Sequence, residues 1–218
     1  MSQEATLANL EKAVELALGL GKPRRFKQSV EVIVALRDVD LKSPQARIRE
    51  TVFLPHPPGK EASVCVVAEG DMELQAREAG VEVLNRQALQ SLSGNKREVK
   101  KLARRCYWVL VRADLMGLAG RILGPALGPR GRAPVPVPPN ANIKELIAKY
   151  RGAVWVRIRN QPQVMARIGA EDMSPRELAE NAAAVLQAVE SRLGKAKISK
   201  VYVKKTMGPP VQVSGFAI

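Results

Sequence analysis

The sequence has little of the residue types that most catalytic and metal sites require. Its 218 residues include one histidine, His56, which lies in a turn-like stretch with prolines on both sides. A lone histidine cannot by itself supply a metal site or a Ser/His/Asp triad. We therefore expect no catalytic residue, no metal site and no cofactor.

Cysteine is also scarce, with only Cys65 and Cys106. Each lies in or beside an apolar run, at residues 64–67 and 106–109. Buried cysteines in a reducing compartment usually remain free thiols, which pack as small hydrophobic groups. A disulfide and a metal-ligand pair are the alternatives. We expect two buried free thiols.

Aromatic residues and long apolar runs are few as well. Aromatic residues make up 4% of the chain, which argues against folds that stack single-stranded bases on rings. No apolar run approaches the roughly 20 residues that a bilayer-crossing helix needs, and the first residues are polar and acidic. We expect an intracellular, cytoplasmic protein with no membrane partner.

Positive charge is abundant. Lysine and arginine number 35 against 21 acidic residues, so the formal net charge is +14 and the pI is near 10.2. Such a balance attracts polyanions, with nucleic acid ahead of membrane surfaces. The hydrophobic content of 46% suffices for the core of one large domain or of two ordinary ones.

Both ends of the chain combine a helix with alternating strands. Helical spacing predicts a helix over residues 7–18, and the capping box from Ser174 to Glu177, with Pro175 at the first helical position, begins another that ends at Gly194. Alternation or short β-branched runs predict strands over residues 29–36, 47–54, 154–158, 164–168, 201–203 and 211–213. We expect the first two strands, joined by a loop that contains Pro44, to pair with each other.

The middle of the chain has a different pattern. Apolar strands are predicted over residues 64–68, 81–84 and 107–111, between helices over 72–79, 88–105, 114–122 and 142–150. This alternation implies a small parallel sheet covered on both faces by helices. We expect residues 124–140 to form a proline-stiffened, arginine-bearing surface loop. A phosphate-binding loop is disfavoured there because no Lys-Ser/Thr pair follows its glycines.

Each outer piece of the chain is too small to bury a good core alone. The two pieces therefore predict one discontinuous domain, residues 1–60 with 152–218, into which a second domain, residues 61–151, is inserted. Proline- and glycine-containing linkers near residues 55–60 and 151–152 mark the two boundaries.

The loop over residues 204–210 joins the last two predicted strands. It offers two lysines, a hydroxyl, a thioether and free backbone N–H groups, which together suit contact with phosphate and sugar. The alternative is an ordinary basic hairpin.

Several motifs in one order resemble the ribosomal protein L1 family, the large-subunit stalk proteins, and in particular its archaeal branch. In chain order these motifs are Arg24–Val32, Leu54–His56, Leu123–Pro125, Gly128–Gly131, Pro136–Ile143, Ile168–Gly169, Ala179–Asn181 and Thr206–Pro209. The resemblance spans nearly the whole chain. It implies an α/β fold of two domains: domain I is an α/β sandwich with an antiparallel sheet built from both chain ends, and domain II is an inserted, Rossmann-like, three-layer α/β domain.

The resemblance also implies a function. It is that of a structural constituent of the large ribosomal subunit, which binds ribosomal RNA at the mobile stalk near the transfer-RNA exit site. Partners would be this ribosomal RNA, transfer RNA in the exit site and the protein's own messenger RNA, which it would repress; the free protein would be a monomer. The alternatives are a general basic nucleic-acid-binding protein and a nucleotide-dependent enzyme built on the middle domain.

The resemblance places RNA contacts mainly on domain I. The residues that it implies are Arg25, Phe26, Ser29, Met165, Gly169, Thr206, Met207 and Gly208. We expect a basic stripe on the same domain to add affinity, through Lys27, Arg159, Arg167, Lys204 and Lys205. The alternative for Phe26 is a core ring, and for each basic residue a solvated face. Domain II should carry a weaker basic surface formed by Lys96, Lys100, Lys101, Arg130 and Arg132.

Overall fold

The computed structural model describes residues 3–43 and 48–216 and forms two compact units. Unit 1 comprises Met1–Glu61 and Gly152–Ile218, and unit 2 comprises Ala62–Arg151. That each unit folds as an independent domain stays a prediction. Arg47, at the start of one predicted strand, and Pro44, in the loop before it, lie outside the described residues. No described helix is long and apolar enough to cross a membrane.

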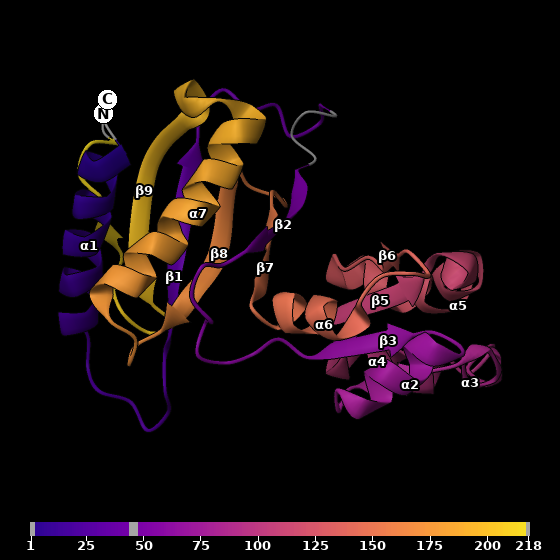
Figure 1. The fold of residues 1–218 in the computed structure, drawn as a ribbon. Coiled ribbons are helices and arrows are strands. Elements are labelled where there is room, and N and C mark those ends of the chain that lie inside the picture. Colours follow the sequence, from indigo (N-terminus) through magenta and orange to yellow (C-terminus); the bar gives the residue numbers. More distant parts are fainter. Residues whose placement is uncertain (1–2, 44–47, 217–218) are drawn as a thin grey trace. The chain divides into compact units, whose positions relative to one another are not determined.

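Unit 1 is built on an antiparallel sheet of four strands (Figure 1). Its order is β10 (Val211–Gln212), β9 (Ile198–Lys205), β1 (Ser29–Leu36) and β8 (Gln163–Ala170). The strand β2 (Arg49–Phe53) pairs with β7 (Ala153–Arg157) in a separate two-stranded sheet. The predicted pairing of the first two strands is therefore wrong. Alternation of apolar and polar residues identified both segments as strands but does not specify which strand pairs with which. In the structure β1 pairs with β8 along one edge and with β9 along the other, so no edge remains for β2.

Two helices cover one face of the four-stranded sheet, α1 (Gln3–Gly19) and α7 (Pro175–Leu193) (Figure 1). Alternate residues of β1, from Val30 to Leu36, are buried beneath them, whereas the intervening residues are only partly buried. The capping box that begins α7 is present, because the Ser174 side chain accepts from the Glu177 N–H and the Glu177 carboxylate accepts from Ser174. The core of unit 1 thus lies between the sheet and these helices.

Unit 2 is a parallel sheet with helices on both faces, as the sequence predicts. The strand order is β4 (Glu82–Leu84), β3 (Val64–Val67), β5 (Trp108–Arg112) and β6 (Val135–Val137). One face packs against α3 (Arg86–Ser91), α4 (Lys96–Arg105) and α5 (Met116–Leu127). On the other face Trp108 contacts Tyr150 of α6 (Ile143–Arg151), which packs beside α2 (Asp71–Glu78). The two units together confirm the predicted mixed α/β class.

Two expectations for unit 2 are wrong in detail. The predicted helix over 88–105 is broken into α3 and α4, because Gly94 has a positive φ of 83° and Asn95 begins a new helix by accepting from the Glu98 N–H at 3.2 Å. The predicted surface loop over 124–140 is partly regular. Its first residues extend α5 through Pro125, and residues 135–137 form β6. As an edge strand, β6 tolerates Pro136, which donates no hydrogen bond.

The two cysteines are joined in a disulfide, so the expectation of two free thiols is wrong. Their Cα atoms are 5.6 Å apart although 41 positions separate them in the sequence. Cys65 lies in β3 opposite Val109 of the neighbouring β5, and Cys106 lies between α4 and β5. Strand pairing therefore brings the two sulfur atoms together, a proximity that spacing alone could not reveal.

Candidate nucleic-acid interface

Three loops of unit 1 meet at one end of its four-stranded sheet. There β1 begins at Ser29, opposite Ala170 at the end of β8, and Val30 lies opposite Lys205 at the end of β9. The loops are residues 20–28, 171–174 and 206–210. We call this region the loop end of the sheet. Most of the predicted RNA-binding residues lie in these loops or in the adjoining strands.

Gln28 holds the three loops together. Its side chain is almost completely buried, at 2% exposure. Its backbone N–H and its side-chain amide donate to the two carboxylate oxygens of Glu171, at 2.9 and 3.2 Å. Its side-chain oxygen accepts from the Met207 N–H at 3.1 Å. Sequence reasoning missed Gln28 because a glutamine between a basic stretch and a strand gives no sign of burial.

The turn at Thr206, Met207 and Gly208 is bonded internally. The N–H and hydroxyl of Thr206 both donate to Ser29 O, at 2.9 and 3.2 Å, and the Gly208 N–H donates to Lys205 O at 2.9 Å. With the Met207 N–H on Gln28, all three backbone donors of the turn have partners within the protein. The expectation that they are free is wrong. The turn presents the Met207 side chain, which is 56% exposed, on a fixed backbone.

Lys205 lies beneath this surface. Its side chain is 6% exposed, and its ammonium donates to Leu18 O at 2.8 Å, close to the end of α1. The last turn of α1 has no basic residue of its own, so Lys205 supplies the cation that the exposed carbonyls of a helix C-terminus favour. The structure therefore does not bring Lys205 to the surface with its neighbour Lys204.

Lys205→Met tests this supporting role. The substitution keeps most of the apolar stem but leaves the Leu18 carbonyl without its charged donor. We therefore expect the free energy of unfolding to fall by about 1–3 kcal/mol. Urea unfolding followed through Trp155, the only tryptophan of unit 1, in a Trp108→Phe background measures the change. Lys204→Met removes the same charge and a hydrogen bond to Thr206 O at a more exposed position, where water can replace the donor, so it should cost less than about 0.5 kcal/mol. Equal losses in the two variants would contradict the capping role.

The exposed side chains at the loop end combine positive charge with apolar surface. Phe26 is 53% exposed, so the alternative of a core ring is wrong, and Arg25 beside it is exposed too. Lys27 forms an ion pair with Asp172, and this hydrogen bond lowers the pKa of the Asp172 carboxyl. An RNA phosphate that binds Lys27 would therefore compete with Asp172.

The outward face of the sheet continues this surface. On the central strand β1, Glu31 lies between Lys204 on β9 and Arg167 on β8. Two residues further along β1, Ile33 lies between Tyr202 on β9 and the exposed Met165 on β8. The guanidinium of Arg167 also donates to Lys60 O in the segment that leads towards unit 2.

Two other predicted residues are not part of this exposed surface. Gly169 is buried, and a Cβ at this position would overlap Leu178 Cδ2 and come within 2.6 Å of Met173 Sδ, so its place is set by the packing of α7 on β8. Arg159 is exposed but follows β7 near the opposite end of the sheet, where β8 begins opposite Ala35. Six strand positions separate Ala35 from Ser29, or about 20 Å at about 3.3 Å per residue.

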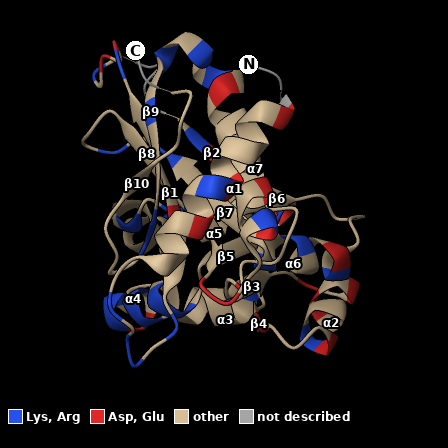
Figure 2. Ribbon diagram, turned by 90° about the vertical axis from the view of Figure 1, so that its left-hand side faces the viewer, with Lys and Arg blue, Asp and Glu red and all other residues tan. Residues whose placement is uncertain are grey.

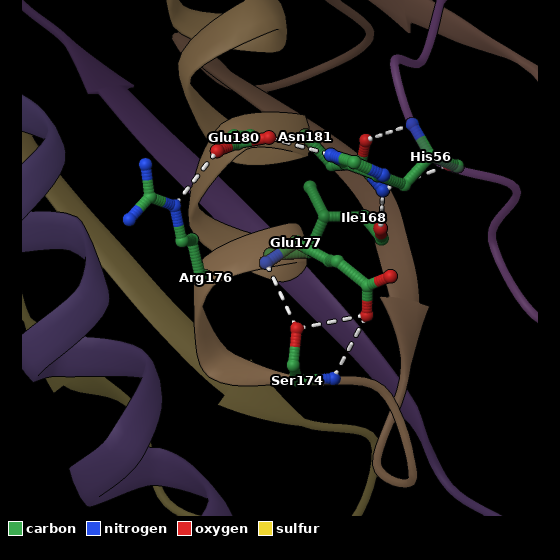
Figure 3. Close-up of polar contacts among 7 residues, drawn as sticks. All are labelled: His56, Ile168, Ser174, Arg176, Glu177, Glu180 and Asn181. Atoms are coloured by element: carbon green, nitrogen blue, oxygen red, sulfur yellow. Dashed lines mark hydrogen bonds and ion pairs between the residues drawn. The ribbon is translucent and has the colours of Figure 1, made fainter.

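A second polar cluster explains two of the family motifs (Figure 3). Asn181 of α7 is buried; its side-chain oxygen accepts from the His56 N–H at 2.9 Å, and its amide donates to His56 O at 3.0 Å and to Ile168 O at 2.7 Å. His56 Nε2 lies 2.5 Å from Glu180, and hydrogen bonds from His56 and Arg176 lower the pKa of Glu180. The lone histidine thus helps to hold the segment after β2 against α7.

One group of potential metal ligands occurs among the described residues. The sulfur atoms of Cys65 and Cys106 and a carboxylate oxygen of Glu82 lie within 4.8 Å of one another. The disulfide occupies both sulfur atoms, and Arg105 donates to Glu82 at 2.6 Å. With its sulfur atoms joined, this group offers no thiolate to a metal ion.

Comparison with known proteins gives one consistent family. The family model described as "Ribosomal protein L1p/L10e family" matches residues 12–209. The protein named large ribosomal subunit protein uL1 of Aeropyrum pernix is 81% identical over 213 residues, 98% of each chain. The proteins of the same name from Hyperthermus butylicus and Staphylothermus marinus are 55% and 52% identical, over 94% of this chain in both cases and over 95% and 96% of their own lengths.

Proposed function

Because the chain belongs to the ribosomal protein L1p/L10e family, we propose that unit 1 binds the stalk region of large-subunit ribosomal RNA at its loop end. As a member of this family the protein is a structural constituent of the large ribosomal subunit and is not an enzyme. It follows that the nucleotide-dependent enzyme is set aside, while the choice between specific and general RNA binding needs a test.

The observation that carries the proposal is the exposed Met207 on an internally bonded turn. An RNA helix displays 2′-hydroxyls in a shallow minor groove, where a protein recognises local shape rather than base edges. A turn whose backbone N–H groups are already bonded cannot adapt by forming new backbone hydrogen bonds. Selectivity would therefore come from the fixed shape of the turn and from the exposed Phe26 in the loop 20–28 at the same end of the sheet.

Positive charge around the turn supplies affinity. With Lys205 buried and Arg159 at the other end of the sheet, four of the predicted cations remain near the loop end: Arg25, Lys27, Arg167 and Lys204. Four phosphate contacts predict a slope of log affinity against log salt of roughly −3, at −0.7 to −0.9 per contact. Arg167, Lys27 and Lys204 must each give up an internal partner to bind a phosphate, so these four cations should not produce a slope steeper than this value.

We also propose the finer partners that the family resemblance implies. In the assembled subunit the protein lies near transfer RNA in the exit site, and when free it represses its own messenger RNA by binding it through the loop end. Since one surface would serve both ribosomal and messenger RNA, the two should compete for the free protein.

The proposal is tested by salt-titrated binding to the stalk fragment and to an unrelated RNA hairpin. We expect a preference of about 4 kcal/mol or more for the stalk, the lower range of specific over non-specific binding in protein–DNA systems. A chain in which residues 62–151 are deleted and the ends joined should keep most of this preference. Equal affinity for both RNAs would identify a general basic protein, and loss on deletion would place the specific site outside unit 1.

A further inference from the structure

The helix α4 of unit 2 carries an unusual concentration of positive charge (Figure 2). Six of its ten residues are lysine or arginine, and all six are exposed. Its buried residues, Val99, Leu102 and Ala103, all face the core of unit 2. The outward side of α4 is therefore cationic and carries no exposed apolar side chain.

Three of these cations form a row along one side of the helix. Lys96, Lys100 and Arg104 are four positions apart, which at 1.5 Å per residue spaces their Cα atoms by about 6 Å along one side of the helix. Arg97 lies next to the row. Among the described residues none of these four forms an ion pair, whereas Lys101 pairs with Glu98 and Arg105 pairs with Glu82. Net positive charge thus remains on the outward side of α4.

The ends of α4 are fixed. Asn95 caps the N-terminus, and the guanidinium of Arg132 donates to Ala103 O and Cys106 O at the C-terminus, at 2.8 and 2.7 Å. The disulfide of Cys106 ties the same end to β3. Because the helix is already held, a ligand that binds the row need not order the backbone, which lowers the entropic cost of binding.

We propose that the outward face of α4 is a second RNA-binding surface, which contacts the sugar–phosphate backbone of double-helical RNA without reading its sequence. A protein partner is disfavoured because interface hot spots are enriched in tryptophan and tyrosine as well as arginine, and this face offers arginines but no exposed aromatic or apolar side chain. A single strand is disfavoured because α4 has no aromatic side chain on which bases could stack. Regularly spaced cations match a regularly spaced phosphate backbone.

The predicted role of Arg130 and Arg132 in this surface changes accordingly. Arg130 donates to Ala126 O at 2.8 Å, and Arg132 bonds the end of α4 while it stacks on Tyr107. These two arginines hold helix ends, so α4 itself supplies the contacts to the RNA backbone.

The test uses the full chain and an RNA duplex of about 16 base pairs, the span of a known sequence-independent duplex binder. The variant is Lys96→Gln/Lys100→Gln/Arg104→Gln. Its control of equal charge is Lys144→Gln/Lys149→Gln/Arg121→Gln, which removes two lysines and one arginine from α6 and α5 of the same unit; Lys144 is paired with Glu78, unlike the cations of the row. We expect the α4 variant to lose affinity for the duplex by roughly 100-fold near 0.1 M salt and to flatten the salt slope by about 2 to 3. The control should change far less.

A second measurement needs no variant. Acylation of lysines in the wild-type protein should be slowed by the duplex at Lys96 and Lys100 but not at Lys144 and Lys149. Equal losses in the α4 variant and the control, or no protection of Lys96 and Lys100, would overturn the proposal. Tighter binding of a single strand, or equal competition by polyglutamate at matched charge, would overturn the assignment to duplex RNA. The proposed function of unit 1 is tested separately, by the preference for stalk RNA over a hairpin. A failure of that proposal can therefore be distinguished from a failure of the present one.

Discussion

Met207→Asp should lower affinity for stalk RNA by about 1,000-fold, which would remove the whole of a 4 kcal/mol preference. The aspartate would stand at an exposed position of the turn and would repel the phosphates that Lys204 and Arg25 are proposed to attract. The fold should survive, because Met207 contributes only its backbone N–H to Gln28 and any residue except proline retains that group. The loss is therefore expected in binding and not in stability.

The matched control is Leu74→Asp in α2 of unit 2. Leu74 is 59% exposed, so this variant adds the same charge at an equally exposed apolar side chain. It should lose affinity for all RNAs slightly and keep the preference for the stalk. Met207→Leu, which keeps the apolar volume, should stay close to wild type. If Met207→Asp and Leu74→Asp lose the same affinity, net charge and not the turn controls binding.

The sequence predicted which residues of unit 1 form helices and strands better than it predicted which strands pair. Alternation over 29–36 found β1 and its buried face, and Ser174 with Glu177 marked the start of α7. Both signals are local, since the side chains that create each of them lie within a few residues of one another in the sequence. The partner of β2 is not local. It is β7, about a hundred positions away, and nothing in the two strand sequences distinguishes this pairing from one with β1.

The same limit applies to the site. Sequence motifs identified the turn at Thr206–Gly208 and the exposed Phe26, but treated the neighbours Lys204 and Lys205 alike. Strand alternation sends one of them outward and the other towards the end of α1. The missing cation in the last turn of α1 was the one signal that could have suggested a distant donor. For Gln28 no comparable signal exists, because its burial depends on three loops that meet only in the folded chain.

The disulfide gives the largest expected change in stability. Closing a loop across 41 positions removes unfolded-state entropy worth about 4 kcal/mol at 25 °C in the chain-entropy model. In a unit of this size that amounts to a rise in melting temperature of very roughly 15–30 °C. The sequence pointed to free thiols because reducing cytoplasm is the usual case, yet intracellular disulfides do occur in hyperthermophilic archaea. Both sulfur atoms are buried, so reductant should reach them only when unit 2 opens.

Each unit contains one tryptophan, which allows the effect to be assigned. Trp108 is buried in unit 2 and Trp155 lies in unit 1. The protein is reduced in denaturant and refolded. The free energy of unfolding reported by Trp108, measured in a Trp155→Phe background, should then fall by about 4 kcal/mol. The free energy reported by Trp155, measured in a Trp108→Phe background, should not change. Cys65→Ala/Cys106→Ala is the control, since reductant should not change it further. A shift of both transitions would mean that the two units unfold together. An unchanged Trp108 transition would mean that packing around the two sulfur atoms, and not the bond between them, holds β3 to the end of α4.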